Sequence, residues 1–184
     1  GSYLYKTQDQ KYKYINEEVF NSLIVRDIVN KYKIRNKQVM GLLIDFLMDN
    51  ISNLLSPNNI CDVLNKNESE ITRKTGSKYI EYLEAAFLIK VIHRTDDTAK
   101  KYQREVSFKI YLTNPSLRCA LFQPIRATDE EIGDLVETAV YAQWIPRRGV
   151  DISYANWRLH NNNQGEVDIV GIDIARQKPN WSVE

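Results

Sequence analysis

Long apolar runs, cysteine pairs and glycine-rich stretches are all missing from this 184-residue sequence. No segment approaches the roughly 20 apolar residues of a membrane-spanning helix, and the N-terminus lacks the layout of a signal peptide. The two cysteines, Cys61 and Cys119, lie far apart and outside metal-ligand spacing, which excludes a zinc site of the finger type and favours a reduced protein. With only 7 glycines, none in a P-loop, we expect no ATP binding. These absences predict a cytoplasmic protein without a membrane partner.

An excess of charge of one sign is also lacking, since 25 Lys and Arg residues oppose 24 Asp and Glu residues. The distribution is uneven, because residues 1–125 carry 19 basic and 14 acidic residues while residues 126–184 carry 6 and 10. The overall charge therefore gives no attraction toward nucleic acid, and such a partner must be recognised through local basic clusters.

The spacing of apolar residues predicts a helical first half. Residues 1–20 have no sustained period and are expected to form an arm, with Gly1 and Ser2 as a cloning remnant. Apolar residues at helical intervals predict helices over 21–32, 36–53 and 71–87, and Ser56-Pro57 is typical of the start of a short helix between the last two. Strands are expected over 88–92 and 106–112, around a polar loop at 93–104. This order predicts a winged helix-turn-helix domain over residues 21–123.

A second unit is predicted after a boundary near Gln123-Pro124. Thr128 and Glu131 have the spacing of a capping box. The helix that follows is expected to bury one face, made of Ile132, Leu135, Val136, Ala139, Val140 and Trp144. Strand-like runs at 152–159, 166–172 and 181–184 complete an α/β module over 126–184 that we expect to be truncated at its C-terminal end. The predicted fold class is α+β.

Three acidic residues are candidates for catalysis in the second unit: Glu137 in the helix, and Asp168 and Glu184 in strands. Metal-dependent cleavage of a phosphodiester needs carboxylates on adjacent strands to hold Mg²⁺, here Asp168 and Glu184, and a lysine two residues after the second acid. That lysine would be residue 186, beyond the last residue of the sequence. We expect Asp168 to be the most buried of the three. The alternative is that all three are solvated surface acids.

Basic residues cluster at two places in the first unit. Arg73, Lys74 and Lys78 lie near the start of a helix that would occupy the recognition position, and Lys100, Lys101 and Arg104 lie in the loop of the hairpin. A helix-turn-helix protein contacts DNA at these two places. We expect both clusters to form one basic face. Tyr79, Tyr82 and Tyr111 are spaced for packing and not for base stacking.

The order of seven short runs resembles the C-terminal half of a group of prokaryotic AAA-type ATPases, a region known as domain of unknown function 4143. The runs are 24–28 (IVRDI), 78–89 (KYIEYLEAAFLI), 109–114 (KIYLTN), 133–140 (GDLVETAV), 156–158 (NWR), 166–170 (EVDIV) and 183–184 (VE). The resemblance implies a winged helix followed by a restriction-endonuclease-like (PD-(D/E)xK) fold, in which Glu137, Asp168 and Glu184 fall on the acids of the motif. The sequence lacks the family's ATPase domain and the final lysine of this motif.

We therefore expect a non-catalytic C-terminal part of a prokaryotic ATPase that binds nucleic acid or acts as a regulator through its winged helix. Its expected partners are double-stranded DNA and the ATPase domain of the same parent protein, and no cofactor is expected in this part of the chain. A metal-dependent nuclease, which would need Mg²⁺, is one alternative. A protein-interaction module that docks on the missing ATPase domain is another.

Overall fold

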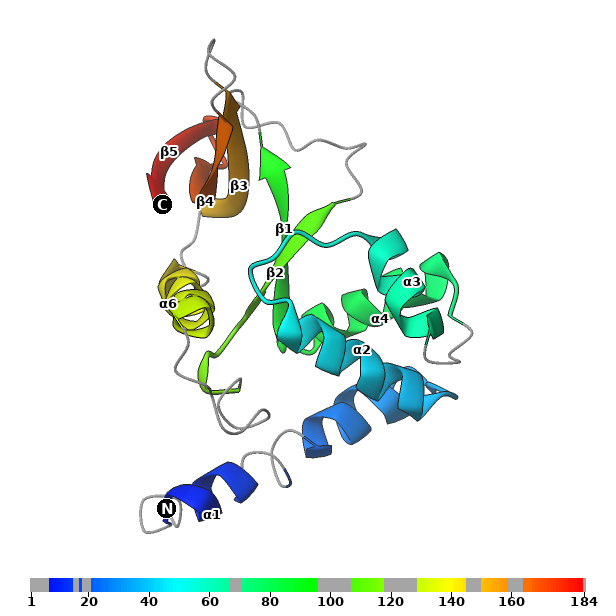
Figure 1. Ribbon diagram of the computed structural model, residues 1–184. Helices are drawn as coiled ribbons and strands as arrows, with labels where there is room; N and C mark the ends of the chain where they lie inside the picture. The colour runs from blue at the N-terminus through cyan, green and yellow to red at the C-terminus, as the bar shows by residue number, and fades with distance from the viewer. Residues whose placement is uncertain are drawn as a thin grey trace.

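The protein has a mixed α+β fold, in which helices pack against a five-stranded sheet (Figure 1). The computed structural model describes residues 7–14, 17, 21–66, 71–95, 107–117, 129–144, 150–158 and 164–183. Its helices are α1 (Gln8–Lys13), the π-helix η3 (Leu23–Asn30), α2 (Lys37–Asp49), α3 (Pro57–Lys66), α4 (Arg73–Ala85) and α6 (Asp129–Trp144). Its strands are β1 (Ile89–Thr95), β2 (Phe108–Leu112), β3 (Val150–Arg158), β4 (Gln164–Asp173) and β5 (Lys178–Val183).

Local sequence signals explain where several helices begin and end. Asn36, Ser56 and Thr72 cap α2, α3 and α4, because each side-chain oxygen accepts a hydrogen bond from the backbone N–H three residues later. Residues 1–20, which are predicted to form an arm, include the short helix α1, and Thr7 and Gln10 form the capping box that starts it. Thr128 and the boundary near Gln123-Pro124 lie outside the described residues.

The predicted second helix is shorter than its apolar spacing indicates. α2 ends at Asp49, and Ser52 has a positive φ of 64° that a helix does not allow. The chain then runs beside β2, where Ser52 donates its N–H to the Ile110 carbonyl and Leu55 exchanges two backbone hydrogen bonds with Phe108. Pairing with β2 therefore replaces the last turn of the expected helix, because it satisfies the same backbone groups.

The sheet has the strand order β2-β1-β3-β4-β5. β1 and β2 form an antiparallel hairpin, β3, β4 and β5 form an antiparallel meander, and the two parts join where β1 runs parallel to β3 through Arg94↔Tyr154 and Thr95↔Ala155. β1 therefore extends to Thr95, into the segment that was predicted as a loop from residue 93. The sheet is continuous from the hairpin of the first predicted unit to the strands of the second.

Strand β2 separates two hydrophobic cores. Phe108, Ile110 and Leu112 face a larger core that includes buried residues of α2, α3 and α4, whereas Tyr111 belongs to a second core with Tyr141 of α6. Side chains of a strand alternate between its faces, so residues 109 and 111 share the side opposite to 108, 110 and 112. Figure 1 shows α2, α3 and α4 on one side of the hairpin and α6 on the other. All five residues of β2 are buried because both faces are covered.

Helix α6 buries the predicted face only in part, through Val140, which packs against the second core. Ile132 and Val136 are 45% and 55% exposed, whereas Thr138 and Tyr141 are buried. The Tyr141 ring stacks on Tyr111 of β2 with 4.5 Å between the ring centroids. The helix is therefore rotated about its axis so that residues 134, 137, 138 and 141 face the first half of the chain. Polar side chains contact the sheet where apolar ones were expected.

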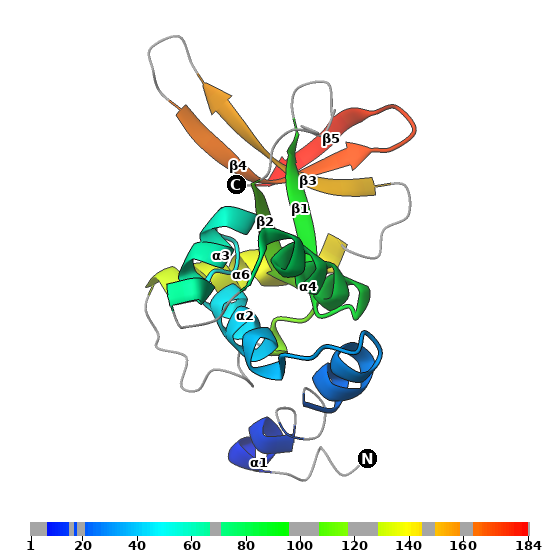
Figure 2. The same cartoon turned by 90° about the vertical axis from the view of Figure 1, so that its right-hand side faces the viewer.

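Two glycines of β4 lie beneath tryptophan rings of the neighbouring strands. Gly165 is paired with Trp157 of β3 and Gly171 with Trp181 of β5, and a Cβ added at these glycines would lie 2.5 Å and 2.1 Å from the indoles. Each indole covers the backbone at a place where a side chain would displace it. The meander, seen at the top of Figure 2, is thus held by aromatic rings packed over glycine.

We predict that Gly171→Ala lowers the free energy of unfolding by about 1–3 kcal/mol, because Trp181 must move away from β4. The measurement is urea unfolding followed by circular dichroism. Gly41→Ala in α2 is the control, since its added Cβ meets nothing within 4 Å. That change should stabilise the protein by about 0.5–1 kcal/mol, because alanine favours a helix. Equal stabilities of the two variants would contradict the packing argument.

Candidate functional site

A buried lysine forms the centre of an ion cluster between the hairpin and the second half of the chain. Lys109 lies on the β2 face that also carries Tyr111, and its side chain is only 6% exposed. Its Nζ atom lies over the Tyr154 ring of β3, 5.6 Å from the ring centroid. A lysine is found this deep only where charged partners compensate for the loss of water.

Three carboxylates surround the Lys109 ammonium. Its Nζ lies 3.1 Å from Oδ1 of Asp168 and 3.9 Å from Oε1 of Glu137, and it is also paired with Glu166. Glu166 and Asp168 are two residues apart in β4, so their side chains leave the same face of the strand. Glu137 comes from α6 and accepts a hydrogen bond from the Tyr111 hydroxyl. One cation therefore joins β2, α6 and β4.

The cluster is electrostatically unbalanced, with three carboxylates around one ammonium. Burial disfavours the charge of Lys109, but its hydrogen bonds to Glu166 and Asp168 outweigh this and raise the pKa of Lys109 above its ordinary value. Burial also raises the pKa of Glu137, and the Tyr111 hydroxyl and the Lys109 ammonium oppose that shift without cancelling it. Burial, followed by the charge of Glu137, raises the pKa of Tyr111, so its hydroxyl stays a proton donor. Lys109 is thus held charged, while Glu137 takes up a proton more readily than an ordinary glutamate does.

A second polar contact ties α6 to the turn after α2. The Ser52 hydroxyl donates to Oδ1 of Asp134 over 3.0 Å. Asp134 and Glu137 are three residues apart in α6, so they lie on neighbouring positions of one helix face. This face of α6 therefore meets the first half of the chain through Ser52, Lys109 and Tyr111.

The arrangement does not fit Mg²⁺, which the resemblance to restriction endonucleases implies. Carboxylate oxygens are suitable ligands, but the ammonium of Lys109 already lies among those of Glu137, Glu166 and Asp168. Across the part of the chain that the structure describes, no group of three or more His, Cys, Asp or Glu side chains is arranged to hold a metal ion. With Lys109 in place, the acids have a counter-ion of their own.

The structure brings together two of the three acids that the sequence singled out, and their predicted catalytic role stays a prediction. Glu137 and Asp168, which are 31 positions apart, converge on one ammonium. Glu184 lies outside the described residues, so the predicted metal pair with Asp168 stays a prediction. The expectation that Asp168 is the most buried acid is wrong, because its side chain is 36% exposed and that of Glu137 is 21% exposed. β4 places Asp168 near the rim of the cluster, whereas α6 carries Glu137 against β2.

Sequence reasoning missed Lys109, Glu166 and Tyr111. A signal was available for Lys109, because a single lysine interrupts the run Phe108 to Leu112, whose other members are all apolar or aromatic. A charge in a strand that is covered on both faces requires a partner. Nothing in the spacing indicated which acids would supply it.

The basic start of α4 is exposed, as predicted. Arg73, Lys74 and Lys78 are all exposed, and they follow the Thr72 cap in the first two turns of the helix. The predicted basic residues of the hairpin loop, Lys100, Lys101 and Arg104, lie outside the described residues. Packing is confirmed as the role of Tyr111, which is buried, and of Tyr82, which stacks on another tyrosine.

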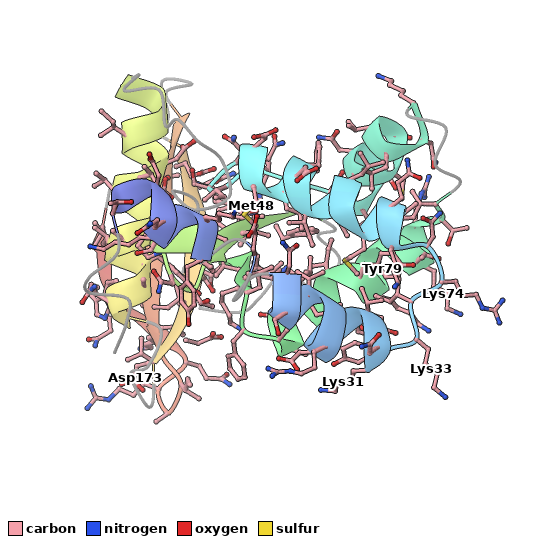
Figure 3. All side chains as sticks on the ribbon, turned by 90° about the horizontal axis from the view of Figure 1, so that it is seen from below. Lys31, Lys33, Met48, Lys74, Tyr79 and Asp173 are labelled. Atoms are coloured by element: carbon pink, nitrogen blue, oxygen red, sulfur yellow. The ribbon has the colours of Figure 1, made fainter. Side chains whose placement is uncertain are left out.

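A further basic segment, not singled out from the sequence, lies in the turn between η3 and α2. Lys31, Lys33, Arg35 and Lys37 are exposed, and no acidic residue occurs between Asp27 and Asp45. The Tyr32 ring stacks on Tyr82 of α4 at 3.7 Å between centroids, which places this turn against α4. Figure 3 shows Lys33 and Lys74 at the same end of the molecule, with Lys31 along the same edge. These four basic residues occur at every second position. That spacing matches neither a helix face nor a loop motif, so the sequence did not indicate the cluster.

None of the described helices has the length and apolar character needed to cross a bilayer. The fold and these clusters define a mixed α+β protein with a basic helix start and an acidic centre built around one buried lysine. The family model of a domain of unknown function (DUF8612) matches residues 1–129, and the chain belongs to this family.

Similarity also extends to an uncharacterized protein of Haemophilus influenzae (strain ATCC 51907 / DSM 11121 / KW20 / Rd), which is 28% identical over 100 residues. The aligned region covers 54% of this chain and 25% of that protein, so the chain spans about a quarter of the relative's length. No solved structure matches.

The raised pKa of Glu137 predicts a pH-dependent effect of Glu137→Gln. As pH rises, the unfolded state loses this proton first, at the ordinary value of 4.5, so ionisation of Glu137 lowers stability from there up through its raised pKa. Glutamine does not ionise. The free energy of unfolding of Glu137→Gln relative to the wild type should therefore increase as pH rises above 4.5. Urea unfolding at several pH values measures this difference.

Glu81→Gln on the exposed surface of α4 is the control for the removal of one carboxylate. Its stability difference from the wild type should change little over the same pH range. A difference for Glu137→Gln that stays constant or decreases with pH would show that Glu137 is not the strained acid of the cluster.

Proposed function

We propose that this chain binds nucleic acid through the exposed basic start of α4 and acts as a non-catalytic, regulatory part of a larger protein. The observation that carries the proposal is the group of Arg73, Lys74 and Lys78, exposed on the helix that follows α3 and precedes the hairpin. The larger protein is a prokaryotic AAA-type ATPase according to the resemblance in the sequence, and its ATPase domain is a proposed partner.

The order of elements around α4 supports a winged helix-turn-helix. In such a domain a short strand between the first two helices pairs with the hairpin that follows the third. Here α2, α3 and α4 precede β1 and β2, and Leu55, between α2 and α3, forms an antiparallel bridge to Phe108 of β2. In the proposed winged helix, α4 would be the recognition helix, whose first residues enter the major groove.

Packing between α3 and α4 supports the same interpretation. Gly76 of α4 is buried, and a Cβ there would lie 3.6 Å from Sγ of Cys61 in α3. The two helices therefore approach closely at a position without a side chain. Lys74 and Lys78, each two residues from Gly76 along α4, lie on the other side of the helix, are exposed and are available to phosphate groups.

The basic turn before α2 extends this surface. Lys31, Lys33 and Arg35 are held beside α4 by the Tyr32–Tyr82 stack, and with Arg73 and Lys74 they make five exposed cations from two segments. A duplex carries its phosphates on two strands, so cations from two segments can contact it along its length. Double-stranded DNA is the proposed ligand.

A metal-dependent nuclease is the second candidate function, and one observation favours it. Glu137 of α6 and Asp168 of β4 converge, as in a restriction-endonuclease-like fold in which a helix precedes an antiparallel meander. Lys109 argues against activity with its side chain in this position, because its ammonium lies where a metal ion would compensate for the carboxylates. The non-catalytic proposal is therefore preferred.

We predict that the double variant Arg73→Ala/Lys74→Ala binds a fluorescent DNA duplex more weakly than the wild type, whatever the base sequence. The slope of log affinity against log salt concentration should become shallower by about 1 for each phosphate that the variant no longer neutralises. Fluorescence anisotropy at several salt concentrations measures both quantities. Arg176→Ala/Lys178→Ala removes the same charge from the exposed turn after β4 and from the first residue of β5, and it should leave affinity and slope nearly unchanged.

If the wild type does not bind duplex DNA at low salt, the nucleic-acid proposal is wrong. The interaction with an ATPase domain then becomes the preferred function.

The turn before α2 generates a separate prediction. Lys31→Ala/Lys33→Ala/Arg35→Ala should also weaken duplex binding and flatten its salt dependence, because these residues would contact phosphates beside those that α4 contacts. The same anisotropy titrations measure this effect. If the α4 variant binds more weakly and this variant does not, the basic turn has no part in binding while the role of α4 remains.

A further inference from the structure

The acidic centre contains a residue that the restriction-endonuclease motif does not supply. Lys109 comes from β2, in the first half of the chain, whereas Glu137, Glu166 and Asp168 come from α6 and β4. The lysine side chain is almost completely buried, and the three carboxylates are 21% to 36% exposed. The cation thus lies on the inner side of the cluster and the acids on the outer side.

Three carboxylates at one place repel one another unless a cation or protons balance them. In a metal-dependent hydrolase a divalent ion would do this. Here the ammonium of Lys109 has one acid at 3.1 Å and another at 3.9 Å, and Glu166 is in direct contact. A divalent ion bound to the same oxygens would face a positive charge within the same small volume.

We propose that Lys109 is a built-in counter-cation, which excludes divalent metal from the carboxylates of Glu137, Glu166 and Asp168 and holds the β1–β2 hairpin against α6 and β4. The acids are therefore expected to bind a metal ion only when the charge of Lys109 is removed. The proposal goes beyond nucleic-acid binding by α4 and does not depend on it.

The surroundings of Lys109 support a contact between two parts of the fold. Tyr111, two residues along β2, donates to Glu137 and stacks on Tyr141, so the same strand holds α6 at two more points. Ser52 adds the hydrogen bond to Asp134 of α6. Because Lys109, Tyr111 and Ser52 all belong to the first half of the chain, a movement of the hairpin away from α6 would remove Lys109 from the acids and break these contacts together.

The test compares binding of Mn²⁺ alone by the wild type and by Lys109→Met, which keeps the length of the side chain and removes its charge. Free Mn²⁺ is measured by electron paramagnetic resonance, and the thermal midpoint Tm is measured with and without the metal. We expect no Mn²⁺-dependent shift of Tm for the wild type. Lys109→Met should have a lower Tm in the absence of metal, and its Tm should rise with Mn²⁺ concentration because the metal binds the folded state.

Two controls separate the proposed effect from nonspecific ones. Lys90→Met removes a half-exposed lysine from the neighbouring strand β1, and this variant should gain no Mn²⁺ binding. Lys109→Met/Asp168→Asn should lose the Mn²⁺ binding that Lys109→Met gains. If Lys109→Met is unfolded without metal, Mn²⁺ should restore its circular dichroism spectrum, and the double variant should not respond.

Mn²⁺ binding by the wild type that disappears in Asp168→Asn would overturn the proposal, because the metal would then bind with Lys109 present. A folded Lys109→Met that binds no Mn²⁺ would also overturn it, and so would an unfolded Lys109→Met that Mn²⁺ does not restore. In each of these cases Lys109 would be an ordinary buried ion-pair partner.

Discussion

The positive charge buried in β2 is the constraint on which the arrangement of the two halves depends. Lys109 lies in a strand whose opposite face belongs to the core of α2, α3 and α4, so the lysine can only point toward α6 and β4. An unpaired ammonium there would be unstable by several kcal/mol. The second half of the chain must therefore supply acids at this place, and Glu137, Glu166 and Asp168 do so.

The same constraint links the two surfaces to which function is ascribed. α4 ends at Ala85 and β1 begins at Ile89, so the helix that presents the basic cluster is followed almost at once by the hairpin that presents Lys109. A ligand that moved α4 relative to α6 would also change the distance between Lys109 and the acids. A short covalent connection therefore joins the basic surface to the acidic centre, and a ligand at the proposed basic surface would expose the acids only if it preferred the separated state.

The elements themselves were largely predictable. Ser56-Pro57 marked the start of α3, helical spacing predicted α2, α4 and α6, and alternation predicted β2, because these signals act between residues close in sequence. The errors occurred where a distant partner decides the outcome. Residues 52 to 55 pair with β2 instead of extending α2, and α6 turns its Glu137 face inward while Ile132 and Val136 are exposed.

The sequence by itself determined the α+β class, most of the helices and strands, the basic start of α4 and the two acids Glu137 and Asp168 as candidates. Only the tertiary structure decided that these acids meet Lys109, that Glu166 joins them, and that Lys31 and Lys33 lie beside α4. Local propensity acts over a few residues, so it predicts helices, strands and caps. The ion cluster joins residues 109, 137, 166 and 168. These residues are close because of the order of the strands and the rotation of α6, and no pattern of neighbouring residues predicts the strand order or the rotation.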